Sequence, residues 1–95
     1  MDLEMIKNIA VPIFLRYDVA KAYVFGSFSR EEQGDNSDID FLIEYEPKAK
    51  RSLFILVRLK NELQEALQKE VDVVTVSSLS PHIRESVLKE KRVIM

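Results

Sequence analysis

The sequence of 95 residues has room for one domain with one core, and 46% hydrophobic with 32% charged residues is ordinary for a globular protein. A formal net charge of -2 argues against direct nucleic-acid binding, and the absence of cysteine excludes disulfides and thiolate chemistry. No apolar run approaches the roughly 20 residues of a membrane span. The N-terminus lacks the features of a signal peptide, so we expect a cytoplasmic protein with a single domain over residues 1–95.

Apolar residues at three- and four-residue spacing predict a first helix from Met1 to Tyr17 with one buried face. Pro12 interrupts this pattern, so we expect a kink or a late helix start. Asp18 is the expected turn residue, because Asp tolerates left-handed geometry. Valine, alanine and aromatic residues then predict a strand from Val19 to Phe25, which Gly26-Ser27 ends.

The middle of the chain predicts a short helix, a turn and a central strand. Residues Phe28 to Gln33 can form a helix whose N-terminus faces the Gly-Ser turn. The run from Gly34 to Ser37 has the composition of a turn. Residues Ile39 to Tyr45 are apolar on both faces, which is typical of a strand covered on both sides.

The last half predicts a long helix, a third strand and a C-terminal helix. A leucine stripe indicates a helix over roughly Ser52 to Gln68, with Ser52 as its N-cap. A third strand is expected from Val71 to Val76. Ser80-Pro81 is an N-cap followed by proline at the first helical position. The final residues, Val93 to Met95, are a short edge strand or a frayed helix end.

Two aspartates one residue apart predict a metal site at the start of the second strand. Because side chains alternate across a strand, Asp38 and Asp40 emerge on one face with Cα atoms about 6.5 Å apart. Paired carboxylates suit Mg²⁺, which binds oxygen ligands together with substrate phosphates. Asp72, on a strand expected beside the second, can complete a two-ion arrangement or act as general base for an attacking hydroxyl.

The Gly26-Ser27 turn predicts a phosphate site. Glycine lets the backbone approach a ligand closely, and free amides at a helix N-terminus favour anionic oxygens. Ser27 can donate a hydrogen bond to the β or γ phosphate. Arg30 can bind a phosphate or pair with Glu31 or Glu32 instead, and both alternatives stay open.

The plain alternative is that the Asp-Ile-Asp segment is a solvated strand start and the Gly-Ser pair an ordinary turn. Against it, Asp40 and Asp72 stand in apolar runs, where a carboxylate is costly unless it is paired or bound to metal. His82 is expected to be a surface or capping residue. A loose basic cluster is interpreted as a solvated face that an acidic partner can use, and it comprises Lys48, Lys50, Arg51, Arg58 and Lys60.

Together these residues resemble the minimal nucleotidyltransferase (MNT) branch of the polymerase-β-type nucleotidyltransferase superfamily. The resemblance implies an α/β (α+β) fold, a small mixed β-sheet flanked by helices, and ATP and Mg²⁺ as reactants. It implies Asp38, Asp40 and Asp72 as catalytic carboxylates and metal ligands. It also implies Gly26, Ser27, Arg30 and Ser37 as nucleotide-binding residues. The matching segments are Phe25-Gly26-Ser27-Phe28-Ser29-Arg30, Ser37-Asp38-Ile39-Asp40-Phe41-Leu42-Ile43, Val71-Asp72-Val73-Val74-Thr75 and Ser78-Leu79-Ser80-Pro81.

Members of this branch are commonly antitoxins of HEPN-domain ribonuclease toxins, which they inactivate by moving AMP from ATP onto a tyrosine hydroxyl. The resemblance therefore implies a HEPN toxin as the protein partner. The chain departs from the branch at Glu31 and at Gln68, where glycine is frequent, and at Gly34-Asp35-Asn36, where Thr-Pro-Asp is frequent. These departures affect the shape of the connectors and leave the three carboxylates in place.

Three functional hypotheses follow from the sequence. The first is an adenylyltransferase whose partner protein presents the acceptor hydroxyl, since 95 residues leave no room for a second substrate-binding domain. The second is a non-catalytic antitoxin that masks its toxin by stoichiometric binding. The third, a small-molecule nucleotidyltransferase, needs a second domain or a homodimer to form an acceptor pocket. The oligomeric state and the base preference stay open.

Overall fold

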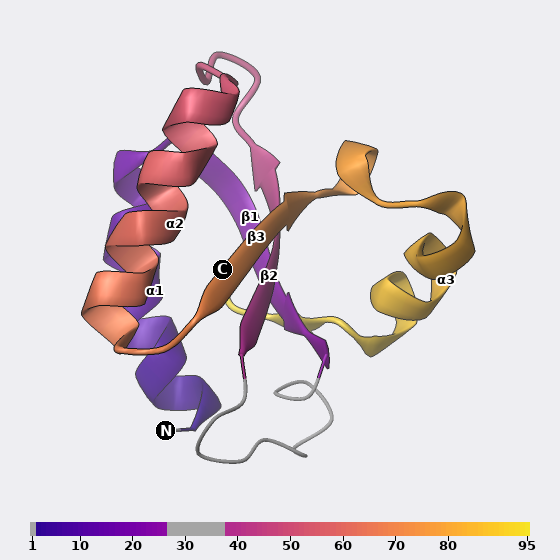
Figure 1. Cartoon of the computed structure of the whole chain (residues 1–95), viewed down its shortest axis with the longest axis horizontal. Coiled ribbons are helices and arrows are strands. Elements are labelled where there is room, and N and C mark those ends of the chain that lie inside the picture. The colour runs from indigo at the N-terminus through magenta and orange to yellow at the C-terminus, as the bar shows by residue number, and fades with distance from the viewer. Residues whose placement is uncertain (1, 27–37) are drawn as a thin grey trace.

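A four-stranded mixed sheet forms the centre of the molecule (Figure 1). The computed structural model describes residues 2–26 and 38–95. Its elements are α1 (Leu3–Arg16), β1 (Val19–Phe25), β2 (Ile39–Tyr45), α2 (Leu53–Leu67), β3 (Val71–Thr75), the 3₁₀ helix η2 (Val76–Ser78), α3 (Pro81–Glu90) and β4 (Arg92–Val93). The predicted α+β fold with a small mixed sheet flanked by helices is confirmed.

The strand order β3-β2-β1-β4 contains one parallel pair. Strand β1 lies between β2 and the edge strand β4 and pairs antiparallel with both, whereas β2 and β3 run parallel. A parallel pair needs a crossover connection, and α2 supplies it. The starts of β2 and β3 therefore lie at the same end of the sheet.

Helices α1 and α2 cover one face of the sheet, and α3 lies on the other (Figure 1). The larger core lies beneath α1 and α2, where Phe14 and Phe41 meet edge to face with ring centroids 5.2 Å apart. A smaller cluster on the α3 side joins Leu42 to Leu79 and Val87. Because β2 is buried on both faces, its apolar run was a correct sign of a central strand. None of the described helices is long and apolar enough to cross a bilayer.

Helix α1 begins at Leu3, well before Pro12, and so does not show the late start that was one of the two alternatives expected from this proline. The Asp2 side chain caps it by accepting a hydrogen bond from the Met5 amide at 2.9 Å, and Pro12 lies inside the helix. The expectation of a late start is therefore wrong. Proline forfeits one backbone hydrogen bond, but burial of residues such as Ile6 and Phe14 holds the helix against the sheet.

The other predicted helix ends are confirmed. Asp18 adopts φ 57°, the left-handed geometry expected after α1. Ser52 caps α2 by accepting a hydrogen bond from the Ile55 amide, and Ser80 caps α3 ahead of Pro81.

The strand predictions hold with one adjustment. The strands Val19–Phe25 and Ile39–Tyr45 have the predicted bounds. The third strand ends at Thr75, because Val76 begins η2 instead of extending the strand. Of the two alternatives for the C-terminus, the edge strand is the one observed. The predicted short helix over 28–33 and the turn over 34–37 lie outside the described residues.

A left-handed residue ends α2 where glycine would fit better. Gln68 adopts φ 56° and ψ 39°. For a non-glycine residue this conformation costs about 1–2 kcal/mol, and glycine avoids the cost at the price of greater unfolded-state entropy.

We expect Gln68→Gly to raise the free energy of unfolding by about 0.5–1 kcal/mol. Urea unfolding followed by circular dichroism measures the change. Glu65→Gly, at an exposed position within the same helix, is the control and should lower stability by about 1 kcal/mol. Equal destabilisation by the two glycines would contradict the proposed strain at residue 68.

Candidate active site

Three aspartates gather at the end of the sheet where β2 and β3 begin. Asp40 of β2 is level with Asp72 of β3 in the parallel register, and with Phe25 of β1 on its other side. Asp38 directly precedes β2. The expectation that the third strand lies beside the second is therefore confirmed, and the pairing places two carboxylates from distant parts of the chain side by side.

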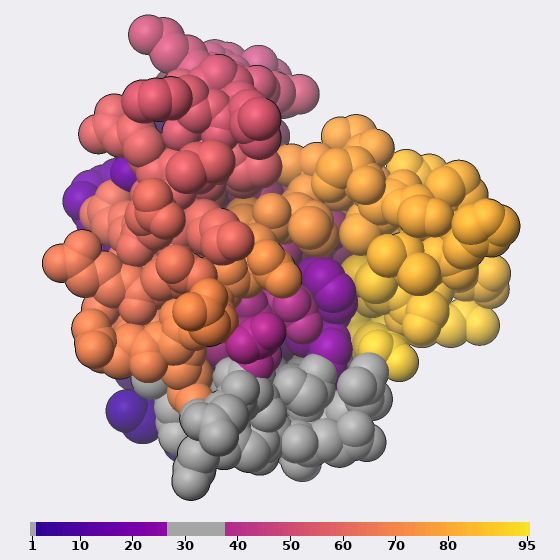
Figure 2. Space-filling view, viewed as in Figure 1, coloured from indigo at the N-terminus to yellow at the C-terminus, as the bar shows by residue number. Residues whose placement is uncertain are grey.

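The alternation of β2 directs Asp40 away from the main core. Ile39 and Phe41 are fully buried in the core under α1 and α2, whereas Leu42 packs with the α3-side cluster. Asp40 shares the face of Leu42 and is half-buried, while Asp38 and Asp72 are exposed. The molecular surface is hollowed between α2 and α3, and strand residues form the floor of this recess (Figure 2).

Gly26 lies so close to the central carboxylate that a side chain there would have to displace it. Its φ of +73° is left-handed, and a Cβ added to it would lie 2.6 Å from Asp40 Oδ2. Glycine is thus required both by the backbone conformation and by the contact with Asp40. The end of β1 and the start of β2 are locked together at this point.

The local environment disfavours the charge on Asp40. Burial is the largest cause of its raised pKa, followed by the charges of Asp72 and then Asp38. A divalent cation would offset all three effects, and carboxylate oxygens are the ligands that Mg²⁺ prefers. The donor set therefore fits a magnesium ion. Within residues 2–26 and 38–95, however, no three acidic, histidine or cysteine side chains stand close enough together to hold a metal ion.

Lys60 is a residue of this site that the sequence did not reveal. Its Nζ lies 3.5 Å from Asp72 Oδ1, and it reaches the edge strand β3 from helix α2. The sequence analysis placed Lys60 in a loose basic cluster, and the structure separates it from that group. The only signal in the sequence was its place next to the buried Leu59, at the border of the apolar stripe that packs on the sheet.

The remaining predicted residues have two outcomes. Ser27, Arg30 and Ser37 lie outside the described residues, so their roles in nucleotide binding stay predictions. His82 is exposed in the first turn of α3, where its amide donates a hydrogen bond to Ser80 Oγ at 3.3 Å. That position agrees with the surface location expected for it.

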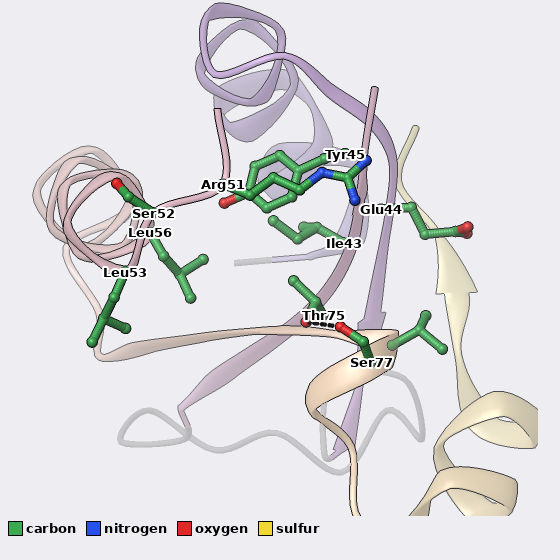
Figure 3. Close-up of a pocket in the computed structure, with 10 residues that line it drawn as sticks. Ile43, Glu44, Tyr45, Arg51, Ser52, Leu53, Leu56, Thr75 and Ser77 are labelled. Carbon is green, nitrogen blue, oxygen red and sulfur yellow. Dashed lines mark hydrogen bonds between the residues drawn. The ribbon is translucent and has the colours of Figure 1, made fainter. Parts of the chain in front are cut away.

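Two hollows lie elsewhere on the molecule. One, of about 460 Å³, is at the far end of β2 and β3 (Figure 3). Its residues Ile43 and Thr75 are paired three positions beyond Asp40 and Asp72 in the register, which is about 10 Å along the strands. The buried hydroxyl of Tyr45 in its wall has no hydrogen-bond partner among the described residues. The second hollow, of about 490 Å³, lies between α1 and α2.

Comparison with known proteins gives a match over nearly the whole chain. The pattern of the family described as "Nucleotidyltransferase domain" matches residues 4–94. A candidate protein adenylyltransferase of Methanocaldococcus jannaschii is 46% identical over 90 residues, which cover 95% of each chain.

Solved structures agree. A candidate minimal nucleotidyltransferase superposes with a TM-score of 0.80 and 35% identity, covering 97% of this chain and 95% of that one. Two toxin–antitoxin complexes share the fold at lower identity. One, with AMP-PNP, has a TM-score of 0.81 at 24% identity, covering 94% of this chain and 72% of that one. The other contains a tri-AMPylated HEPN toxin of Shewanella oneidensis with an MNT antitoxin, with a TM-score of 0.75 at 20% identity over 98% and 71% of the two chains.

The raised pKa of Asp40 predicts a pH-dependent cost to stability. Because the folded state holds the proton more tightly than the unfolded state, stability falls as pH rises from the ordinary value of 3.8 through the raised pKa. Without divalent cations, Asp40→Asn should therefore be more stable than the parent at pH 7, and the difference should vanish below about pH 3.8. Urea unfolding across this pH range tests it. Glu44→Gln, an exposed change on the same strand, should stay within about 0.5 kcal/mol of the parent throughout.

The contact between Gly26 and Asp40 predicts energetic coupling. Gly26→Ala should cost about 1–2 kcal/mol for the left-handed backbone, plus the displacement of the Asp40 carboxylate. In an Asp40→Ala background the displacement is absent, so the same change should cost less. A double-mutant cycle from urea unfolding measures the difference. Additive costs would show that the two residues do not constrain each other.

Proposed function

Since the chain belongs to the nucleotidyltransferase domain family, we propose that it is a magnesium-dependent protein adenylyltransferase that acts as an antitoxin. It would transfer AMP from ATP to a tyrosine hydroxyl of a HEPN-domain partner. The observation that supports this best is the register of Asp40 with Asp72, beside Asp38 and against Gly26. That arrangement concentrates carboxylate oxygens next to a glycine turn, where a nucleotide can approach the protein backbone.

The relatives support the substrates. The Methanocaldococcus jannaschii relative carries the name of a protein adenylyltransferase and matches this chain from end to end. The toxin–antitoxin complexes are more distant and share only the fold. Their AMP-PNP and their AMPylated HEPN toxin are the reasons to propose ATP as donor and a HEPN-domain protein as acceptor here.

The three aspartates are proposed to bind the metal ion and to accept the proton of the tyrosine hydroxyl. When bound, Mg²⁺ neutralises charge on the triphosphate and on the departing pyrophosphate. Asp38 and Asp40 supply its carboxylate ligands. Asp72 supplies a further ligand or accepts the proton of the tyrosine hydroxyl. The tyrosine oxygen then bonds to the α-phosphorus, the bond between the α-phosphorus and the bridging oxygen breaks, and pyrophosphate leaves.

The nucleotide is proposed to bind along the turn after β1. Because Gly26 has no Cβ, no side-chain atom of this residue crowds the Asp40 carboxylate. Ser27, Arg30 and Ser37 are proposed to bind phosphate oxygens. We treat residues 1–95 as a single catalytic domain, which leaves the partner protein to present the acceptor hydroxyl.

One observation favours a second candidate function. Among the described residues no three carboxylates are close enough to share a metal ion, and Asp72 is paired with Lys60. A protein that neutralises a HEPN ribonuclease by binding alone would tolerate such a site. Catalysis and masking differ in whether neutralisation needs the aspartates.

Intact-mass spectrometry separates the two. A HEPN-domain protein offered as the acceptor should gain one or more AMP units on incubation with the chain, ATP and magnesium. Asp38→Asn should lower the rate at least roughly 100-fold, because a lost metal ligand removes several kcal/mol of transition-state stabilisation. Glu85→Gln, at an exposed position of α3, is the control and should leave the rate unchanged.

Two results would overturn the proposal that the aspartates catalyse AMP transfer. One is an unmodified partner that is nevertheless silenced in a stable complex, which supports masking. The other is full AMP transfer by Asp38→Asn combined with Asp40→Asn, which would place the chemistry elsewhere on the chain. Omitting magnesium or adding a chelator should abolish the mass gain.

A further inference from the structure

The first two turns of α2 expose apolar side chains that nothing in the described structure covers. Leu53 and Phe54 are 76% and 75% exposed, and Val57 is 46% exposed. They stand at positions i, i+1 and i+4 of one helix and so form a continuous strip, which we call the α2 ridge. Isolated exposed apolar residues are ordinary, but a contiguous group of large ones marks a surface used for binding.

The hollow on the β3 side of the ridge has both apolar and polar side chains in its lining. Leu56 points from α2 across it toward Ile43 of β2 (Figure 3). Hydroxyl groups of Ser52, Thr75 and Ser77 stand at its rim, and Thr75 Oγ1 and Ser77 Oγ are 3.1 Å apart. A hollow of about 460 Å³ next to exposed Leu53 has room for one or two apolar side chains of a partner.

The hollow on the α1 side of the ridge is basic. The cations in its lining are Arg16, Lys48, Lys50 and Arg58. Two acids, Asp18 and Glu62, also line it, and Glu62 is already bound by Arg16 and by the Tyr17 hydroxyl, which donates to it at 2.7 Å.

Three of these cations are available to a partner. Lys48, Lys50 and Arg58 are exposed and make no ion pair with any residue in 2–26 or 38–95. With four cations and two acids in its lining, the hollow on this side of the ridge carries an excess of positive charge, although the whole chain has a net charge of -2.

We propose that the α2 ridge, with the hollow on each side, is the docking surface for an acidic amphipathic segment of the partner protein. The apolar face of such a segment would cover Leu53, Phe54 and Val57, and its carboxylates would meet Lys48, Lys50 and Arg58. Nucleic acid fits less well, because the exposed aliphatic residues offer nothing to a phosphate backbone. A symmetric contact between two copies also fits less well, because it would bring the same cations close together.

The proposed docking surface lies away from the aspartates that are proposed to carry out the chemistry. The hollow on the β3 side of the ridge contains Ile43 and Thr75, which lie at the opposite end of β2 and β3 from Asp40 and Asp72. A segment seated on the ridge leaves the aspartates open, so a different part of the same partner must bring the acceptor hydroxyl. The identity of the partner rests on the proposed function, whereas the existence of the surface does not.

Measurement of binding to the HEPN-domain protein used as acceptor tests the docking surface. Titration calorimetry is done with Asp38→Asn as the parent, so that no AMP is transferred during the measurement. Leu53→Ser combined with Phe54→Ser should raise Kd about tenfold or more, because both changes remove buried contacts at an interface. Val93→Ser removes an apolar side chain that is 66% exposed on the opposite edge strand, and should leave Kd unchanged.

A second variant tests the charge and does not depend on the helix. Lys48→Glu with Lys50→Glu changes only exposed connector residues, and should weaken binding and reduce its dependence on salt. With Asp38 restored, both variants should raise KM for the partner and leave kcat for AMP transfer unchanged. Unchanged Kd in both variants would overturn the proposal. If the variants bound the partner normally but no longer bound a 20-nucleotide RNA, the surface would be a nucleic-acid site. If they bound the partner normally but no longer self-associated in sedimentation, it would be a contact between copies of this chain. Either result would also overturn the proposal.

The result also distinguishes the two proposals. A complex that depends on the ridge but shows no AMP transfer would keep the docking surface and reject the transferase. AMP transfer by a chain whose affinity for the partner does not change in the ridge variants would keep the transferase and reject the docking surface.

Discussion

The parallel pairing of β2 with β3 is the constraint on which the rest of the molecule depends. It requires a crossover, so α2 must leave the end of β2, pass over the sheet and return to its starting end. That path buries Leu59 and Leu63 in the main core and sets the register in which Asp72 is level with Asp40. A shift by one residue would turn Asp72 into the core and Val73 out of it. Packing of the helix and assembly of the site are therefore one problem for this chain.

The site itself is built at a cost to stability. Burial and the charges of Asp72 and Asp38 raise the pKa of Asp40, and position 26 must be free of a Cβ to leave space for the Asp40 carboxylate. Neither feature improves the core. Both would serve the proposed function, in which a cation offsets the charge of the carboxylates and a phosphate chain occupies the space beside Gly26. Strain of this kind is typical of functional sites, where the surrounding fold supplies the compensating energy.

Chemistry and partner binding are proposed to occupy opposite ends of the same two strands. The starts of β2 and β3 carry the aspartates, and their ends meet the first turns of α2, where the exposed apolar ridge lies between two hollows. A domain of 95 residues cannot enclose a protein substrate. Separate surfaces solve this problem, because the partner can be held by one segment while another reaches the metal. Such an arrangement would also leave room for several acceptor hydroxyls on one partner.

Local patterns along the chain were enough to predict the helices and strands of the described residues and to point to the three aspartates as a candidate site. Periodicity, turn residues and N-caps placed the described strands and helices within a few residues, and the Asp-Ile-Asp segment indicated the chemistry, because these signals are local. Only the tertiary structure decided which side chains meet. Lys60 reaches Asp72 from another element, and Gly26 abuts Asp40 through a strand register that no local pattern encodes. The separation of Lys60 from the other cations likewise follows from the path of α2 across the sheet, since contacts between distant segments depend on packing rather than on spacing along the chain.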